Sequence, residues 1–316
     1  MHTVFIDGHS GTTGLKIREY LQGRDDIELI EIPPEQRKDS SAKKSYLNDA
    51  EVVILCLPDD AARESVSLIE NPAVKVIDAS TAHRVADGWA YGLPELNPAQ
   101  REAIKNTKRV TNPGCHSTGF ILALFPLIDA GIVPRDYPVT VCSITGYSGG
   151  GKRLIAAYKE GRNEGDPLTA PRPYSLTLRH KHLPEMQRIC GLYHPPLFMP
   201  VVGDFSQGMA VSVPLAVRSL AKKVGPDDIA RILAEHYRDE PFIHVLPPND
   251  SEHLDGGFLS PVECNGTNRL DLFVFGHDEQ VLVAARFDNL GKGASGAAVQ
   301  NLNLMLGVSE TTGLRA

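Results

Sequence analysis

The chain has 316 residues, of which 42% are hydrophobic and 22% charged, a length that suggests about two domains with cores of their own. Its 32 Lys and Arg against 39 Asp and Glu give a net charge of −7, which argues against general nucleic-acid binding because phosphates need a basic surface. No run approaches the ~20 apolar residues that span a bilayer. The N-terminal residues lead directly into an apolar strand pattern, without a basic region or a cleavage site. We therefore expect neither a nucleic-acid nor a membrane partner, and no secretory signal.

The five cysteines are odd in number, widely spaced and without a Cys-x-x-Cys pair. This usage disfavours a disulfide framework and a structural zinc site, and it suits a cytoplasmic protein with reduced thiols. The five are Cys56, Cys115, Cys142, Cys190 and Cys264.

The first 115 or so residues alternate between strand and helix patterns. Apolar runs at 4–6, 27–32, 52–57 and 74–79 are separated by helical segments. The run at 52–57 is continuously apolar rather than alternating, as in a strand that is covered on both faces. This part of the chain therefore predicts parallel β-α-β units and a Rossmann-type, doubly wound α/β domain.

The pattern changes from about Pro138. Strand-like runs at 139–144, 209–213, 270–274 and 280–284 follow, and the clearest helix between them is 227–238. The segment 289–307 ends in an amphipathic helix. We expect a second, α+β domain with a mixed or antiparallel sheet.

A glycine turn follows the first strand and opens the first helix. Such a turn lets backbone N–H groups approach a pyrophosphate at the helix N-terminus. Its spacing is G-x-x-G-x-x-G, not the dinucleotide G-x-G-x-x-G, so a plain strand-to-helix turn is the competing interpretation. The residues that we predict to bind a cofactor here are Gly8, Ser10, Gly11, Thr12, Thr13 and Gly14.

The charges after the second strand bear on the choice of cofactor. Glu31 stands where an acid usually holds the ribose 2′-hydroxyl of NAD, whereas Arg37 and Lys38 are placed to hold the 2′-phosphate of NADP. All three are equally well explained as solvated loop charges. The residues alone leave the two cofactors evenly matched.

Cys115 lies in the segment Thr-Asn-Pro-Gly-Cys-His-Ser-Thr-Gly, residues 111–119. A short strand, a Pro-Gly turn and an apolar helix would place this cysteine at a helix N-terminus. There the backbone N–H groups and the helix dipole favour a thiolate and can stabilise an oxyanion. We predict that Cys115 is a nucleophile, and that Cys56 and Cys142, inside apolar strands, are core residues.

A thiolate nucleophile needs a proton shuttle, and His180 and His182 are the candidates. In an extended segment, residues i and i+2 point the same way. Arg179 and Lys181 make the segment a candidate anion site. A metal is disfavoured, since no third ligand stands at a recognisable spacing, so we predict none.

Two further glycine-rich segments are candidates for binding. The one at 147–152 ends in Lys152, which can supply a counter-charge to a phosphate, although the spacing is not that of a P-loop. The other, at 288–296, contains Asn289 and opens the last helix, where it is a candidate to close over a nicotinamide. A flexible loop explains the first equally well.

In this order, the motifs resemble the N-acetyl-gamma-glutamyl-phosphate reductase family in its short form, over nearly the whole chain. The glycine turn is common to many nucleotide folds, whereas the other motifs together are specific. They are the segments 91–96 (Tyr-Gly-Leu-Pro-Glu-Leu), 112–115 (Asn-Pro-Gly-Cys), 180–185 (His-Lys-His-Leu-Pro-Glu) and 288–300.

The resemblance implies a glyceraldehyde-3-phosphate-dehydrogenase-like fold. Residues 1–115 and 289–316 would form the dinucleotide-binding domain, and residues 116–288 the catalytic and oligomerisation domain. It further implies a homo-oligomer, a dimer or a tetramer, and NADPH as the cofactor, which favours Arg37 and Lys38 as ligands of the 2′-phosphate.

The resemblance also implies the chemistry. N-acetyl-glutamyl 5-phosphate would be reduced to the 5-semialdehyde and phosphate in arginine biosynthesis, through a thioester on Cys115. Either His180 or His182 would be the acid/base, and Lys152, Arg179 and Lys181 are candidates to bind the phosphate or carboxylate of this small acyl phosphate. His116 departs from the family, in which an aromatic residue is frequent at this position, and whether it tunes Cys115 stays open.

Two alternatives remain at this point. A related acylphosphate reductase, such as an aspartate-semialdehyde dehydrogenase, would use the same chemistry on another acyl phosphate. A non-catalytic nucleotide-binding protein would bind the cofactor without a reactive thiol, which the surroundings of Cys115 argue against.

Overall fold

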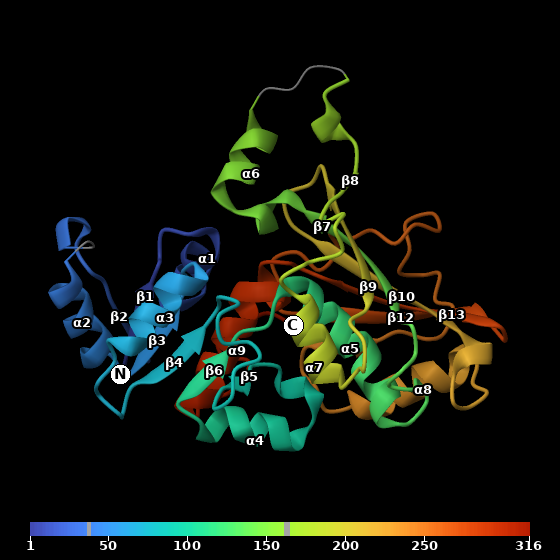
Figure 1. The fold of residues 1–316 in the computed structure, drawn as a ribbon, viewed down its shortest axis with the longest axis horizontal. Coiled ribbons are helices and arrows are strands. Elements are labelled where there is room, and N and C mark those ends of the chain that lie inside the picture. Colours follow the sequence, from blue (N-terminus) through green and yellow to red (C-terminus); the bar gives the residue numbers. More distant parts are fainter. Residues whose placement is uncertain (37–38, 161–164) are drawn as a thin grey trace. The chain divides into compact units, whose positions relative to one another are not determined.

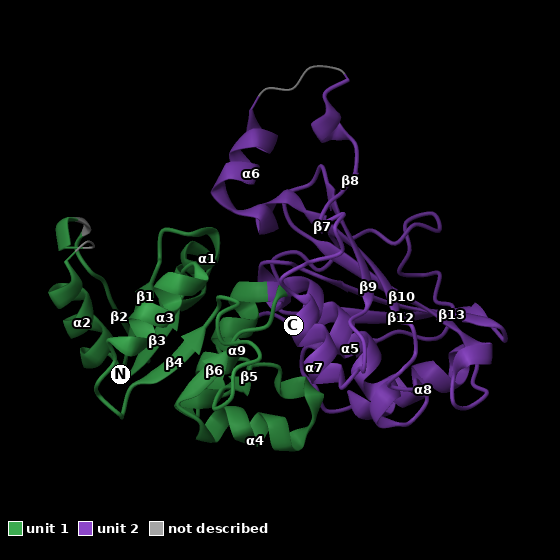
Figure 2. Ribbon diagram, viewed as in Figure 1, with its two compact units in different colours: residues 1–114, 294–314 green, residues 115–293, 315–316 purple. Residues whose placement is uncertain are grey.

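The computed structural model describes residues 1–36, 39–160 and 165–316. The chain divides into two compact units (Figure 2). Unit 1 comprises residues 1–114 and 294–314, and unit 2 comprises residues 115–293 with the last two residues. The chain therefore passes from one unit to the other after residues 114 and 293. The domain boundaries expected from the sequence lie after residues 115 and 288.

Unit 1 is built on a parallel sheet of six strands (Figure 1). In hydrogen-bonding order they are β2 (Ile27–Ile30), β1 (His2–Asp7), β3 (Val52–Leu55), β4 (Lys75–Asp78), β6 (Arg109–Thr111) and β5 (Ala90–Tyr91). The order changes direction between β1 and β3, which is the point where open α/β sheets bind nucleotides. All four residues of β3 are buried, as its continuous apolar run predicts.

Helices cover both faces of this sheet. Its helices are α1 (Thr12–Leu21), α2 (Ser40–Asp49), α3 (Asp59–Ser67), α4 (Pro98–Asn106) and α9 (Gly296–Leu306). On one face, apolar residues of α1, α4 and α9 pack on Val4, Ile6 and Ile54. On the other, residues of α2 and α3 pack on Phe5 and Val53. The predicted doubly wound α/β domain is confirmed.

Unit 2 is built on a mixed sheet of seven strands. In order they are β11 (Ile243–Val245), β12 (Leu270–His277), β13 (Gln280–Phe287), β10 (Met209–Ala216), β7 (Thr140–Gly146), β9 (Leu197–Gly203) and β8 (Arg172–Pro173). The pairs β11–β12 and β7–β9 are parallel and the other four are antiparallel. The predicted mixed sheet is therefore confirmed.

Three helices pack on this sheet or on one another: α5 (Cys115–Asp129), α7 (Leu183–Cys190) and α8 (Pro226–His236). The helix α5 lies against β10 and β13. A Cβ at Gly119 would lie 2.6 Å from the Phe287 ring and 2.8 Å from Val211, so a glycine is needed for this close approach. Twelve of its fifteen residues are buried, and this rigid packing fixes where the helix begins. The helix α6 (Gly151–Lys159) stands away from the sheet of its own unit (Figure 1).

Most of the expected elements are present, and the differences are informative. The strand pattern did not reveal β9, β11 or the two-residue strands β5 and β8. The predicted C-terminal helix begins with a π-helical turn, Gly291–Ser295, before α9. Within residues 1–36, 39–160 and 165–316, no helix has the length and apolarity required to cross a bilayer.

Candidate active site

Cys115 is the first residue of α5, as the motif predicts. The strand β6 ends at Thr111, the Pro-Gly turn follows, and the helix starts on the cysteine itself. The side chain is half-buried, whereas nearly all of the helix behind it is buried. At the first turn of a helix the backbone N–H groups and the helix dipole favour an anion, here one held beside the thiol.

Two histidines lie close to this thiol. The Sγ atom of Cys115 and one ring nitrogen each of His116 and His182 all lie within 4.8 Å of one another. His182 is buried, with 4% of its surface exposed, and it occupies the N-cap position of α7 without a side-chain capping bond. The structure therefore brings the predicted nucleophile and one of the two predicted shuttles together.

His180 adjoins this group, although not in the way the sequence suggests. Residues 176–182 form turns rather than an extended strand, and the N–H of His182 donates to Nδ1 of His180 over 3.2 Å. The turn nevertheless brings the two rings together, with centroids 4.7 Å apart and planes nearly perpendicular. His180 also meets the ring of His116, at 5.4 Å.

His116 is at the centre of this ring cluster. It is buried, its Nδ1 lies 2.7 Å from the Oγ atom of Ser143, and its Nε2 lies 2.8 Å from the hydroxyl of Tyr174. Burial, together with the positive charges of His180 and Lys181, lowers the pKa of His116 to about 3. The ring is consequently neutral across the physiological range.

His116, which no ligand spacing in the sequence indicates, lies with Cys115 and His182 in a cluster of three residues whose side chains can each bind a metal ion. Both nitrogens of His116, however, already have hydroxyl partners. A metal ion would have to break one of these hydrogen bonds, so we assign no ion to the three residues.

The glycine segment after β13 packs against the thiol. A Cβ at Gly293 would lie 3.0 Å from the Cβ of Cys115. The buried Asp288 fixes the segment, because its carboxylate accepts from the N–H groups of Leu290 and Gly266, at 2.8 and 2.9 Å, and its carbonyl accepts from Gly293.

Asn289 was predicted as a cofactor ligand, and its amide has partners within unit 2. The side-chain oxygen accepts from the N–H of Gly208 at 2.8 Å, and the side-chain nitrogen donates to Ser148 at 3.0 Å. In this structure Asn289 therefore joins two loops of the same unit.

The predicted nucleotide turn lies in unit 1, between β1 and α1. Gly8 has a φ of +90°, and a Cβ there would collide with the carbonyl oxygen of Cys56. A Cβ at Gly14 would lie 2.6 Å from the carbonyl oxygen of Gly8. Gly11 caps the helix and has no side chain to occupy its first N–H groups. The turn fits a pyrophosphate, because these groups form a bare backbone cradle at a helix N-terminus. Ser10, Thr12 and Thr13 lie on the same turn.

Of the three charged residues that follow the second strand and bear on the choice of cofactor, the structure describes only Glu31. Glu31 is paired with Arg18 at 2.9 Å, and both side chains are largely exposed. Arg37 and Lys38, which we predict to hold the 2′-phosphate, lie outside the described residues.

The three predicted substrate cations, Lys152, Arg179 and Lys181, are all exposed. Lys152 is on the first turn of α6, and the other two flank His180. Lys181 lies near enough to His116 for its charge to lower the pKa of that ring.

Four residues at the site were missed from the sequence: Ser143, Tyr174, Asp288 and Gly293. Ser143 is on β7, and Tyr174 follows β8. Asp288 and Gly293 lie in the segment 288–296, in which the sequence points to Asn289 and a role over the nicotinamide rather than to these two residues. The sequence positions of Ser143 and Tyr174 do not indicate that they hydrogen-bond to His116, because these contacts depend on the register of β7 and on the folding of the loop after β8.

Two family models match the chain. One is described as "Semialdehyde dehydrogenase, NAD binding domain" and matches residues 3–106, within unit 1. The other is described as "Semialdehyde dehydrogenase, dimerisation domain" and matches residues 115–289, within unit 2. The match to the second begins at Cys115.

Curated relatives match from end to end. A protein of Nostoc sp. named N-acetyl-gamma-glutamyl-phosphate reductase 2 is 50% identical over 98% of both chains. A protein of Chelativorans sp. named N-acetyl-gamma-glutamyl-phosphate reductase is 51% identical over 96% of this chain and 97% of its own.

Solved structures share the fold at low identity. A probable aspartate-semialdehyde dehydrogenase of Pseudomonas aeruginosa has a TM-score of 0.72 at 17% identity, covering 96% of this chain and 98% of its own. Aspartate semialdehyde dehydrogenase of Candida albicans, solved with NADP, has a TM-score of 0.60 at 16% identity, covering 97% and 98%.

Proposed function

Because the chain belongs to the N-acetyl-gamma-glutamyl-phosphate reductase family of semialdehyde dehydrogenases, we propose that it reduces N-acetyl-glutamyl 5-phosphate with NADPH. The products are N-acetyl-glutamate 5-semialdehyde, NADP and phosphate, and the reaction serves arginine biosynthesis. The observation that carries the proposal is the sequence identity of 50% to a named reductase over 98% of both chains. The geometry agrees with it, because Cys115 starts a helix and lies close to His182.

Cys115 forms the covalent intermediate. Its thiolate attacks the acyl carbon, a C–S bond forms, and the C–O bond to phosphate breaks, which divides one difficult step into two easier ones. The backbone N–H groups at the start of α5 stabilise the negative charge that develops on the acyl oxygen.

His182 moves the proton. We assign this role to His182 rather than His180 because its nitrogen lies within 4.8 Å of the Cys115 sulfur. It accepts the thiol proton before attack and donates it to the acyl oxygen as a hydride adds to that carbon, which leaves a thiohemiacetal on Cys115. It takes the hydroxyl proton back as the C–S bond breaks, so that the semialdehyde leaves and the Cys115 thiolate is restored. The Gly8–Gly14 turn would hold the pyrophosphate of NADPH, which would supply the hydride.

Exposed cations of unit 2 bind the anionic substrate. Lys181 is the first candidate, since its charge already reaches the ring beside Cys115. Arg179 and Lys152 are the next, for the phosphate or the α-carboxylate.

The test is oxidation of NADPH by the purified protein, with acetylglutamyl phosphate and aspartyl phosphate offered side by side. We expect turnover with the first and none with the second. Cys115→Ala must abolish it, and His182→Asn must reduce it more than His180→Asn. Preference for aspartyl phosphate would instead make the chain an aspartate-semialdehyde dehydrogenase, and cofactor binding without turnover on either would contradict a reductase.

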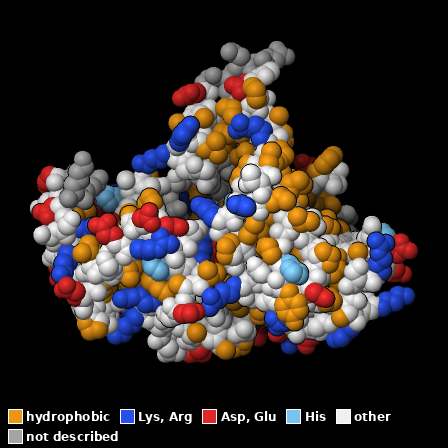
Figure 3. Space-filling view, viewed as in Figure 1, with side chains coloured by type: hydrophobic (Ala, Val, Ile, Leu, Met, Phe, Trp, Pro, Cys, Tyr) orange, Lys and Arg blue, Asp and Glu red, His pale blue; other side chains and the backbone are white. Residues whose placement is uncertain are grey.

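We further propose a homo-oligomer that buries the helix-free face of the unit 2 sheet. Three large apolar side chains on this face are exposed: Ile144 by 41%, Met199 by 50% and Leu197 by 55%. Beside them, a groove of about 490 Å³ is lined by Tyr137, Pro214, Phe275 and Leu282, among others. Figure 3 shows hydrophobic side chains on the surface in the region of β7 and β9.

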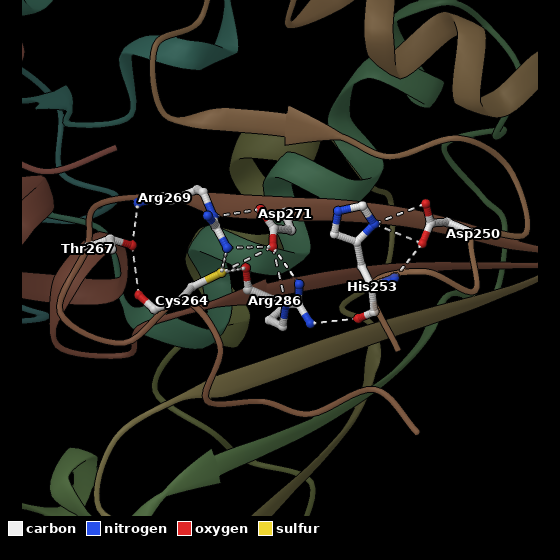
Figure 4. A network of polar contacts seen from close by, with 7 residues as sticks. All are labelled: Asp250, His253, Cys264, Thr267, Arg269, Asp271 and Arg286. Atoms are coloured by element: carbon white, nitrogen blue, oxygen red, sulfur yellow. Dashed lines mark hydrogen bonds and ion pairs between the residues drawn. The ribbon is translucent and has the colours of Figure 1, made fainter. Parts of the chain in front are cut away.

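The other end of this face is already covered. Asp271 accepts from Arg286, which is beside it on β13, and from Arg269, while the Cys264 thiol contacts the same carboxylate at 3.3 Å (Figure 4). Arg286 also donates to the carbonyl of His253. This network fixes the segment between β11 and β12 on the sheet, whereas the apolar side chains of β7 and β9 are exposed to a second copy of the chain, in keeping with a matched model described as a dimerisation domain.

Light scattering after gel filtration tests the interface. We expect an oligomer for the wild type and a monomer for Met199→Glu, because a charge there would be buried unpaired. Leu176→Glu is the matched control, since Leu176 is 75% exposed and lies off the sheet. An oligomer that survives Met199→Glu contradicts this interface.

The five cysteines are free thiols, which suits the cytoplasmic location that we also propose.

A further inference from the structure

Asn112 follows β6 directly and is held by hydrogen bonds at all four of its polar groups, with 1% of its surface exposed. Its backbone N–H donates to the carbonyl of Asp78 at 2.7 Å, and its carbonyl accepts from Nε of Arg84 at 3.1 Å. Its side-chain nitrogen donates to the carbonyl of Ala294 at 2.8 Å, and its side-chain oxygen accepts from Asn301 at 3.3 Å. Neither the backbone nor the amide of Asn112 can move without breaking one of these bonds.

Asn301, a buried residue of α9, determines which way the Asn112 amide faces. The side-chain nitrogen of Asn301 also donates to the carbonyl of Gly92, at 2.9 Å, so the orientation of its own amide is fixed. Turning the Asn112 amide over would place its N–H groups against those of Asn301 and its oxygen against the Ala294 carbonyl, which is unfavourable at both ends. The side-chain nitrogen of Asn112 is therefore committed to Ala294.

The hydrogen bond from Asn112 to Ala294 closes a ring of residues around the start of α5. From Asn112, residues 113–114 lead to Cys115, and on the other side Ala294 directly follows Gly293. Gly293 packs on Cys115, where an added Cβ would lie 3.0 Å from the Cβ of the cysteine. The first of these contacts lies within unit 1 and the second within unit 2. One hydrogen bond and one close packing contact thus complete the ring.

The ring is short, so its two sides cannot shift independently. Only two residues separate Asn112 from Cys115, and the first is Pro113, whose side-chain ring fixes one of its backbone dihedrals. The side that begins at β6 is anchored because β6 pairs with β4 and β5. On the other side, the N–H of Gly293 donates to the carbonyl of Asp288 at 3.0 Å. Loss of the bond to Ala294 would release the backbone at Gly293 while these anchors remain.

We propose that Asn112 is a positioning residue for the nucleophile: its amide, oriented by Asn301, holds the carbonyl of Ala294 and so keeps the backbone of Gly293 against Cys115. The proposal rests on Cys115 as the nucleophile of the proposed function. It assigns Asn112 no part in the chemistry itself.

Steady-state kinetics with acetylglutamyl phosphate distinguish positioning from folding. In Asn112→Ala we expect kcat to fall at least about tenfold, because small displacements of reacting groups slow a reaction strongly. The KM for NADPH should change by less than about twofold, since cofactor binding is not involved. Asn303→Ala is the matched control: Asn303 is also fully buried in unit 1, accepts from Arg24 at 2.6 Å and donates to the carbonyls of Glu310 and Thr312. It should lose thermal stability and keep its kcat. Equal losses of kcat in both variants, or an unchanged kcat in Asn112→Ala, would overturn the proposal.

A double-mutant cycle tests whether Asn112 acts through Gly293. Gly293→Ala presses a methyl group on Cys115 while the ring is closed, whereas in Asn112→Ala the segment 293–294 is free to retreat. Two independent tenfold losses of kcat/KM would multiply to about 100-fold. We expect the double variant to lose only about 10- to 30-fold, because the second substitution acts on a ring that is already open. Losses that multiply would show that the two residues act separately and would contradict the ring.

Hydrogen exchange tests the ring without substrate. In Asn112→Ala we expect the peptide that contains residues 289–296 to exchange about tenfold faster, the scale of one lost hydrogen bond, and in Asn303→Ala to exchange at the wild-type rate. If Asn112→Ala fails to fold, Asn301→Ala replaces it, since it removes the donor that orients the amide, and a smaller rise is expected. Unchanged exchange in the folded variant overturns the proposal even in an active reductase. Faster exchange in a protein that reduces neither acyl phosphate would retain the ring and reject the proposed function.

Discussion

Gly293 packs directly on Cys115, and a Cβ added at Gly293 would lie 3.0 Å from the Cβ of the cysteine. The same atom would lie 3.2 Å from both the Phe287 ring and the carbonyl oxygen of Asp288. Since α5 is held from behind by its packing on β10 and β13, the thiol has little room to yield. The bare backbone of Gly293 thus forms one wall of the nucleophile's surroundings.

Gly293→Ala is therefore expected to impair catalysis more than folding. Its neighbours must move by a few tenths of an ångström, which costs about 1–3 kcal/mol of stability in a packed interior. Displacement of the sulfur should lower kcat/KM at least about tenfold, because reacting geometry is demanding. Thermal unfolding and steady-state kinetics measure the two effects. Gly225→Ala is the control, as a Cβ there would meet nothing closer than 3.9 Å. Equal losses in both variants would show that Gly293 has no special bearing on Cys115.

Cys115 should be alkylated fastest of the five thiols at pH 7. Burial raises the pKa of Cys56 to about 12 and, with the charge of Asp271, that of Cys264 to about 11, and burial also raises those of Cys142 and Cys190. A thiol with an ordinary pKa near 8.5 is a few per cent thiolate at pH 7, whereas one at 11 is about 0.01%. From these fractions we expect labelling of Cys115 to be roughly 300-fold faster than that of Cys264. Timed alkylation with mass-spectrometric mapping measures this, and faster labelling of Cys190 or Cys264 would count against the assigned nucleophile.

The sequence was most informative where one short stretch sets both structure and chemistry. The Gly8–Gly14 turn and the start of α5 at Cys115 lie where the strand, turn and helix patterns predict them. Each depends on neighbours in the chain, so local residues determine it. The histidines at 180 and 182 were found for the same reason, although the turn that orients them was not.

The parts that were missed depend on long-range register. Ser143 reaches His116 because β7 pairs with β10 and α5 packs across the sheet, and Tyr174 reaches it because a loop folds back after β8. Residue spacing carries no signal for such contacts. Asn289 lies in a segment with a cofactor-like pattern, and its role as a cofactor ligand stays a prediction; its bonds to Ser148 and Gly208 are again contacts that residue spacing does not signal.

NADPH should be preferred over NADH. Arg37 and Lys38 follow the second strand in the sequence, and Glu31, the acid that would select NAD, is already paired with Arg18. Replacing Arg37 and Lys38 together by Ala should raise the KM for NADPH by roughly tenfold or more, the scale of one lost charge-assisted contact, and leave NADH use nearly unchanged. Arg63→Ala with Lys105→Ala removes two exposed cations from other helices of unit 1 as the control. Unaltered NADPH kinetics would make Arg37 and Lys38 ordinary surface charges.

The reverse reaction should depend on phosphate, because the intermediate is a thioester on Cys115. In that direction the thiolate adds to the semialdehyde and a hydride passes to NADP, which leaves the acyl group on sulfur. Water attacks a thioester slowly in a site that excludes it, so turnover must wait for an oxyanion acceptor. Phosphate is that acceptor, and arsenate should replace it.

In the absence of both anions, rapid mixing should show a single burst of at most one NADPH formed per active site, followed by almost no further NADPH formation. Cys115→Ala should abolish the burst, whereas His182→Asn should slow it and leave cofactor binding intact. Steady turnover without phosphate, or a burst that survives Cys115→Ala, would exclude the covalent mechanism.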